Sequence, residues 1–273
     1  MDRPIRALAK AVRERIPRGF VRDLLHGVPT GKPAHPPLAG VSLGCWMSAA
    51  LLDAARADPR AVRLLLATGI ANAVPAAAAG LTDWSSLHKE QQRVGFVHMA
   101  TNLVALGLFS GSLLARIRGR ESAGRALSCA GLVAGGVGGY LGGHLAYRMA
   151  AGANHAPQVS HLVPLGWHDL CLLKDLPDGR PVSRRLGYIS LFVLRRGERV
   201  TVMVDNCPHL SGPLHQGRVV EEDGEACVVC PWHGSTFRLD DGSVKHGPAT
   251  APAPTFEART LKDGTVQVKP SLT

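Results

Sequence analysis

Two short segments of the chain each pair a cysteine with a histidine. One reads Cys207-Pro208-His209 and the other Cys230-Pro231-Trp232-His233, with twenty residues between His209 and Cys230. A 2Fe-2S cluster with two cysteines on one iron and two histidines on the other needs this ligand composition, because neutral imidazole raises the potential above that of an all-cysteine cluster. The four residues are therefore candidate cluster ligands, and the chemistry that they predict is one-electron transfer.

A zinc site is the competing interpretation of these segments. Cys227 and Cys230 form a C-x-x-C pair that could make a tetrahedral site with Cys207 and one histidine. However, Cys227 lies in an alternating run typical of a strand, where a free cysteine is usually a small buried hydrophobe. A zinc site built on Cys227 would also leave one of the two matched histidines without a role.

The two segments resemble the Rieske family, and the similarity covers about residues 160–270. It includes the downstream features Phe237, Asp241-Gly242 and Gly247-Pro248. The resemblance implies an antiparallel β fold in which two loops hold a 2Fe-2S cluster through Cys207, His209, Cys230 and His233.

The resemblance also implies a subtype. Rieske subunits of quinol-oxidising complexes add one cysteine to each loop and join the two as a disulfide, but the corresponding positions here are Gly212 and Trp232. The chain therefore resembles the ferredoxin type of dioxygenase and nitrite-reductase systems. The serine that donates to cluster sulfur is present as Ser235, while the tyrosine is replaced by Phe237, which predicts a lower potential than in quinol-oxidising proteins.

The residues around these loops predict an all-β domain over 158–271. Short apolar runs are separated by turn pairs such as Asp223-Gly224 and Asp263-Gly264. The runs span Tyr188 to Leu194, Arg199 to Val204, Ala226 to Val229, Thr255 to Thr260 and Thr265 to Lys269.

The N-terminal half has a different composition, which predicts a four-helix transmembrane bundle over 33–152. A spanning helix needs about 20 mainly apolar residues. Four stretches qualify: Leu38 to Ala55, Leu64 to Thr82, Val94 to Ala115 and Ala126 to Tyr147. The first is the weakest, since it follows Pro36-Pro37 and contains Asp53, and a buried amphipathic helix is its alternative. In the last, glycines at 131, 135, 139 and 143 predict a face where another helix approaches closely.

Charge distinguishes between possible partners and between the two sides of the membrane. The net charge is +10, but eight basic residues lie in the first 32 positions beside the apolar half, which favours a lipid surface over nucleic acid. This basic arm, residues 1–32, carries Ile5, Leu8, Val12 and Ile16 at helical spacing and could lie along the membrane or be a solvated helix. The N-terminal arm and the middle loop hold ten Lys and Arg against seven in the other loops. This bias predicts a bacterial inner-membrane protein with both termini and the β domain in the cytoplasm.

Three histidines in the apolar half form a further candidate site. In the predicted topology His35, His98 and His144 share one membrane level. Polar groups inside a membrane are costly and often functional, so the histidines could ligate a b-type haem or bind a quinone head group. A polar network that only fixes helix packing is the alternative.

The apolar half resembles an uncharacterised bacterial family of four-span membrane domains over about residues 25–155. The matching residues include His35-Pro36, Gly80-Leu81-Thr82-Asp83-Trp84, His98 and Leu141-Gly142-Gly143-His144. The family has no established activity, so the resemblance supports the architecture more than any chemistry.

The sequence as a whole predicts a two-domain α + β protein that transfers electrons at a membrane. We expect one 2Fe-2S cluster, a redox partner protein or quinone, and the lipid bilayer as partners, and an oxidoreductase component more than a stand-alone enzyme. A passively anchored redox sensor or ferredoxin is the alternative. A Rieske oxygenase would need a second domain with a mononuclear iron site, for which the chain has no room.

Overall fold

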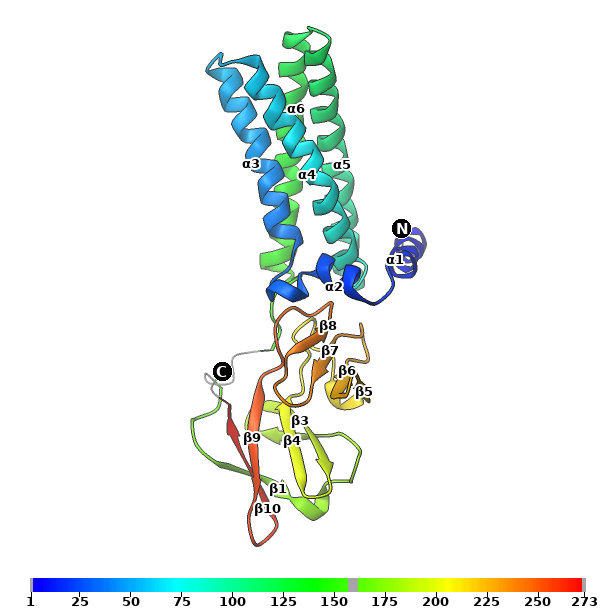
Figure 1. Ribbon diagram of the computed structural model, residues 1–273, viewed down its shortest axis with the longest axis vertical. Coiled ribbons are helices and arrows are strands. Elements are labelled where there is room, and N and C mark those ends of the chain that lie inside the picture. Colours follow the sequence, from blue (N-terminus) through cyan, green and yellow to red (C-terminus); the bar gives the residue numbers. More distant parts are fainter. Residues whose placement is uncertain (1, 157–161, 272–273) are drawn as a thin grey trace. The chain divides into compact units, whose positions relative to one another are not determined.

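The computed structural model describes residues 2–156 and 162–271, and the chain divides into two compact units (Figure 1). The helical unit comprises Met1–Pro17 and Pro33–Gly152. The β unit comprises Arg18–Lys32 and Ala153–Thr273. The β unit therefore contains a segment that precedes the helical bundle in the sequence, a grouping that the sequence pattern did not predict.

The helical unit is built from long apolar helices. They are α3 (His35–Ala54), α4 (Pro59–Trp84), α5 (Lys89–Ile117) and α6 (Glu121–Gly143), and a π-helical turn, η2 (His144–Arg148), extends α6. In the described part of the chain these four are long and apolar enough to cross a membrane. The predicted four-helix architecture is thus confirmed, including its weakest member.

The first of these helices starts earlier than the sequence predicted. It begins at His35, with Pro36 and Pro37 inside the first turn. Proline is tolerated there because the amides of the first turn have no intrahelical acceptor. Asp53, near the other end of α3, forms an ion pair with Arg116 of α5 at 2.5 Å. Pairing lowers the cost of placing these charges beside an apolar span.

Small residues allow α5 and α6 to pack closely. A Cβ atom added to Gly131 would lie 3.0 Å from the Phe109 ring, and one added to Gly138 would lie 2.6 Å from Asn102 Oδ1. Gly139 and Gly136 face open space instead. The contact row therefore runs 131, 135, 138 rather than in steps of four, because a helix has 3.6 residues per turn.

The N-terminal helix α1 (Asp2–Arg15) belongs to the helical unit. Its apolar side is buried, with Ile5 and Ala9 packed in one cluster with Trp84 of α4. Arg93 of α5 forms an ion pair with Asp2 at 2.7 Å. The apolar face of this arm is thus directed at other helices of the unit.

The β unit holds two antiparallel sheets, as the sequence predicted for this half of the chain. The six-stranded sheet has the order β1-β10-β9-β4-β3-β2 and the four-stranded sheet the order β5-β6-β7-β8. The strands of the first sheet are β1 (His168–Leu172), β2 (Val182–Leu186), β3 (Ile189–Arg196), β4 (Arg199–Val204), β9 (Thr255–Thr260) and β10 (Thr265–Pro270). Those of the second are β5 (Arg218–Glu222), β6 (Glu225–Val229), β7 (Thr236–Arg238) and β8 (Val244–His246).

One core cluster connects the two sheets to the cysteines. It contains Phe192 and Met203 from the larger sheet and Val228 and Phe237 from the smaller one, and Cys207 and Cys230 lie in the same cluster. Short helices complete the unit in its described residues: α2 (Phe20–His26) and the 3-10 turns η1 (Val28–Thr30), η4 (Leu173–Asp175) and η5 (Leu214–Gln216).

Candidate metal centre

The two cysteine-containing loops have the same backbone design. The Cys207 amide donates to the carbonyl of Gly212 at 2.9 Å, and the Cys230 amide donates to that of Ser235 at 2.8 Å. In each loop the amide four residues later donates back to the cysteine carbonyl, and that residue has a positive φ: Ser211 at 62° and Gly234 at 79°. The first loop follows β4 and the second connects β6 to β7, so the two sheets hold the loops in place.

The four candidate ligands come together as two pairs. Cys207 and Cys230 pack in one buried cluster and shift each other's pKa, and the rings of His209 and His233 lie edge to face with centroids 5.0 Å apart. In the described residues, no three His, Cys, Asp or Glu side chains converge as for a single metal ion. A cysteine pair beside a histidine pair is what a two-iron cluster requires, since each iron takes two protein ligands.

Backbone amides surround the sulfur atoms. The hydrogen bond from Cys207 lowers the pKa of Cys230 to about 7 against the opposing effect of burial, and amides of Trp232, His233 and Gly234 contribute to the lowering. The same contact and burial raise the pKa of Cys207. Amides that stabilise a thiolate also stabilise iron-bound sulfur, so the loops are suited to hold an anionic cluster.

Ser235 lies directly behind the second loop and is fully buried. Its Oγ accepts a hydrogen bond from the Ala249 amide at 2.9 Å. Because the acceptor role of the hydroxyl is met in this way, its hydrogen remains available for a second partner. Phe237, also fully buried, packs in the same cluster as both cysteines and has no hydroxyl to offer.

The two loops also contact each other at Gly212 and Trp232, the positions that would carry the disulfide cysteines of the quinol-oxidising type. A Cβ atom added to Gly212 would lie 2.8 Å from Cys230 Sγ and 3.2 Å from the Trp232 ring. Gly212 and Trp232 therefore lie side by side, although neither is a cysteine. The indole of Trp232, half exposed at 49%, packs on the first loop in place of a covalent link.

Cys227, the residue on which a zinc site would depend, is directed away from this centre. Its thiol is buried in β6 and donates to the carbonyl of Glu225 at 3.6 Å. Cys207 and Cys230 instead contact each other. The geometry thus favours the interpretation of Cys227 as a small core residue.

An aspartate that the sequence did not single out supports the first loop. Asp205 is 4% exposed, and its carboxylate accepts from the His215 amide at 2.8 Å and lies 2.6 Å from His215 Nδ1. Asp205 also accepts through its carbonyl from Leu214. Asp205 thus links the backbone before Cys207 to His215, which follows it. A single aspartate after a strand has no distinctive sequence pattern, so the sequence could not indicate this role.

In the helical unit, the structure brings together two of the three candidate histidines. The rings of His35 and His98 lie edge to face with centroids 6.2 Å apart. His35 Nδ1 is 2.8 Å from the carbonyl of Ala76, and His98 Nδ1 is 2.8 Å from that of Gly138. A carbonyl only accepts, so each Nδ1 carries hydrogen and each Nε2 carries a lone pair. Each of the four long helices thus contributes one residue to this polar group.

The third histidine is separate from this pair. His144 begins the π-helical turn, and its carbonyl accepts from Met149 at 3.1 Å. Among the described residues, no hydrogen bond or ring contact joins His144 to His35 or His98. The polar neighbour of His98 is Asn102 rather than His144: Asn102 Nδ2 lies 3.3 Å from Nε2 of His98.

Comparison with known protein families now agrees with this geometry. Residues 166–257 match the model of the Rieske 2Fe-2S domain. The β unit carries a Rieske domain. Residues 31–155 match a family described as a predicted membrane protein, DUF2231. The chain therefore joins a membrane domain of unknown function to a domain that implies a 2Fe-2S cluster and electron transfer.

Individual relatives match between a third and two fifths of the chain. The 3-phenylpropionate/cinnamic acid dioxygenase ferredoxin subunit of Photorhabdus laumondii is 29% identical over 100 residues, which cover 36% of this chain and 90% of that protein. Apoptosis-inducing factor 3 of Mus musculus is 26% identical over 94 residues, 34% of this chain, but the match spans only 15% of its length. The structure of the Sphingomonas yanoikuyae B1 ferredoxin is 28% identical, with a TM-score of 0.33, and covers 39% of this chain and all of its own.

Proposed function

We propose that this chain is a membrane-bound electron carrier of the ferredoxin type, with Cys207, His209, Cys230 and His233 as ligands of one 2Fe-2S cluster. The observation that carries the proposal is the pairing of the side chains: two cysteines buried in one cluster and two imidazole rings 5.0 Å apart, on loops of the same backbone design. When bound, the cluster supplies one-electron oxidation and reduction. The cysteines would hold the inner iron and the histidines the outer iron.

The surrounding residues have assigned tasks in this proposal. The amides of the second loop would offset the negative charge on cluster sulfur, and Ser235, whose oxygen accepts from the Ala249 amide, would donate its hydroxyl hydrogen to the cluster. Phe192 and Met203, both fully buried, exclude water from the cysteine side. Trp232 is exposed and His233 half-buried, whereas His209 is buried, so Trp232 and His233 would face the redox partner. The Photorhabdus relative is named as a dioxygenase ferredoxin subunit, which supports a protein partner.

Serine substitutions test the ligand set. In full-length protein reconstituted with iron and sulfide, Cys207→Ser and Cys230→Ser should lose nearly all cluster absorbance and acid-labile sulfide. Cys227→Ser is the matched control and should retain both. Loss of iron in Cys227→Ser, or stoichiometric zinc without sulfide in the wild type, would replace the cluster with the C-x-x-C zinc site.

The His35 and His98 pair supports a second proposal, a redox site within the helical unit. His35 and His98 each have Nδ1 fixed at a backbone carbonyl and a lone pair on Nε2, and they would hold a b-type haem if the Asn102 amide moved away from His98 Nε2. The same imidazoles could instead bind a quinone head group. If His35 and His98 have neither role, their hydrogen bonds to Ala76 and Gly138 only fix helix packing, and the membrane half is a passive anchor.

An optical spectrum separates these cases. Sharp haem bands in oxidised and dithionite-reduced protein, lost in His35→Ala and His98→Ala but kept in His144→Ala, would support the haem site. Cluster bands alone, with quinone reduction lost in the same two variants, would support a quinone site. Unchanged spectra and electron transfer in both variants would leave the passively anchored ferredoxin or sensor.

A further inference from the structure

Helix α2 of the β unit exposes its apolar face and covers its polar face. Three of its four apolar side chains are exposed, while its charged and polar side chains are mostly covered. The exposed fractions are 75% for Phe20, 65% for Val21 and 51% for Leu24. The opposite face carries Arg22 and His26, which are 9% and 0% exposed, and Asp23, whose side chain is 13% exposed.

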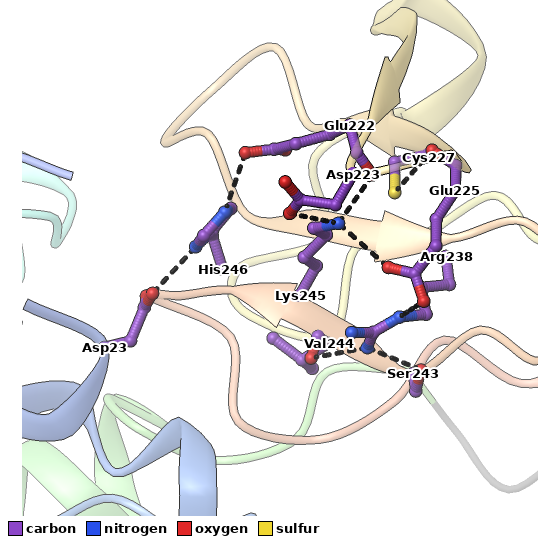
Figure 2. A network of polar contacts seen from close by, with 10 residues as sticks. All are labelled: Asp23, Glu222, Asp223, Glu225, Cys227, Arg238, Ser243, Val244, Lys245 and His246. Atoms are coloured by element: carbon purple, nitrogen blue, oxygen red, sulfur yellow. Dashed lines mark hydrogen bonds and ion pairs between the residues drawn. The ribbon is translucent and has the colours of Figure 1, made fainter. Parts of the chain in front are cut away.

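The covered face is fixed to the Rieske domain through one carboxylate. Figure 2 shows Asp23 reaching His246, and Asp23 Oδ2 lies 2.7 Å from His246 Nδ1. Asp23 Oδ1 accepts from the Gly247 amide at 2.9 Å. The His26 side chain packs on the same glycine, since a Cβ atom there would lie 3.0 Å from its ring.

These contacts determine which way the helix faces. In a helix, residues 20, 21 and 24 share one side, and residues 22, 23 and 26 share the other. With Asp23 and His26 fixed to Gly247, Phe20, Val21 and Leu24 must point away from the Rieske domain. A surface helix in water normally has the reverse arrangement, because exposing apolar side chains forfeits the free energy of burying them.

We propose that the outer face of α2 rests on the lipid bilayer, with Phe20, Val21 and Leu24 entering the boundary between head groups and acyl chains. Chain continuity argues for lipid: α2 ends at His26, nine positions before α3, the first helix able to span a membrane, begins at His35. Charge argues for it too. Lys32, in the segment between α2 and α3, is exposed, which suits anionic head groups.

The proposal gives α2 a role in presenting the cluster. Gly247, to which α2 is fixed, lies two residues before Ala249, and the Ala249 amide donates to Ser235 behind the second cluster loop. Arg18 also reaches this loop, because a Cβ atom on Gly234 would overlap its guanidinium. Seating α2 on lipid would therefore hold the cluster-bearing end of the Rieske domain at the membrane surface.

Photocrosslinking tests the contact directly in the full-length protein, reconstituted in phosphatidylethanolamine and phosphatidylglycerol vesicles. Benzoylphenylalanine replaces Phe20 or Leu24 in single variants, and lipid adducts are counted by mass spectrometry. Val133, 71% exposed on the apolar helix α6, is the positive control, and Tyr188, 99% exposed on the β unit, is the negative one. We expect adduct yields at positions 20 and 24 close to that at 133 and several-fold above that at 188.

Two results would overturn the proposal. Adduct yields at positions 20 and 24 no higher than at Tyr188 would leave this face in water. Crosslinks to a second copy of the chain without lipid adducts would make the face a protein interface. Retained cluster absorbance in each variant shows that the protein is folded, and because the readout is lipid contact, the result is independent of electron transfer.

Discussion

At the residue scale, the proposed chemistry depends on a few side chains. Their residue types already indicated this chemistry in the sequence, before the structure gave their positions. The cysteine and histidine spacing predicted the candidate ligands, and the resemblance to the Rieske family singled out Ser235 and Phe237. Asp205 and Asp23 were not, because isolated carboxylates become meaningful only when the fold brings them to a loop amide 10 or 224 positions away.

Two substitutions behind the cluster should shift its reduction potential in opposite directions. Ser235→Ala removes a hydroxyl hydrogen that stabilises the more negative reduced state, so the midpoint potential should fall. Phe237→Tyr adds a hydroxyl beside the cysteines, so it should rise. A redox titration followed by EPR measures both. Ser183→Ala, in β2 of the six-stranded sheet, is the control and should leave the potential unchanged. A Ser235→Ala potential equal to that of the wild type would show that Ser235 does not tune the cluster.

His246 should make the attachment of α2 dependent on pH. Burial alone would lower the pKa of His246, but hydrogen bonds to Asp23 and Glu222 outweigh it and raise that pKa above its ordinary value. The folded protein thus binds this proton more tightly than the unfolded chain. The resulting stability is fully present below about pH 6.5 and is lost as the pH rises through the raised value.

The measurement is the thermal midpoint of cluster loss for wild type and His246→Gln across that pH range. The wild-type advantage should be largest at the acidic end and shrink as the pH rises. Asp23→Asn should flatten this dependence, because it removes one of the two carboxylates. An advantage that grows with pH would contradict the sign.

At the element scale, predictability followed the length and regularity of the apolar pattern. The bounds of β4 and β9 agree with the sequence prediction, because both runs are bordered by clear turn residues. Strands β7 and β8 were missed, since each has three residues, and β8 contains a lysine and a histidine held by ion pairs with neighbouring carboxylates. The five-residue strands β1, β2 and β5 were missed too, because each carries charged residues that interrupt its apolar pattern. No sequence window could place the seven residues of α2 on β8 and its following turn.

Adjacent glycines in α6 should respond differently to alanine. Gly138→Ala would bring a Cβ atom within 2.6 Å of Asn102 Oδ1, whereas Gly139→Ala meets nothing within 4 Å. We expect Gly138→Ala to destabilise the bundle by about 1–3 kcal/mol and Gly139→Ala to have little effect. Thermal unfolding in one detergent, followed by tryptophan fluorescence, compares them. Equal midpoints would show that α5 and α6 do not pack through residue 138.

At the scale of the whole molecule, the sequence predicted the order of the helical half and the β half along the chain. It did not predict which segments belong to each compact unit. Composition separates the apolar half from the β half, whereas the transfer of Arg18–Lys32 to the β unit depends on contacts more than 200 positions apart in the sequence. Sequence patterns report local periodicity, so such contacts leave no trace in them.

The predicted topology can be tested along the chain. The loops at 55–58 and 118–120 should lie outside the cytoplasm, and the C-terminus inside it, because Lys and Arg concentrate on the other side of the spans. Alkaline phosphatase fused after Thr273 should therefore be inactive and a fusion within 118–120 active. The reverse pattern would place the Rieske domain in the periplasm.

The most direct test of the central claim is pulsed EPR of the reduced full-length protein grown with 15N-histidine. We predict couplings from two iron-bound imidazole nitrogens. If a cluster still forms in the variants, one coupling should disappear in His209→Ala and the other in His233→Ala. A cluster signal without histidine nitrogen couplings, or a protein that holds zinc and no cluster, would contradict it.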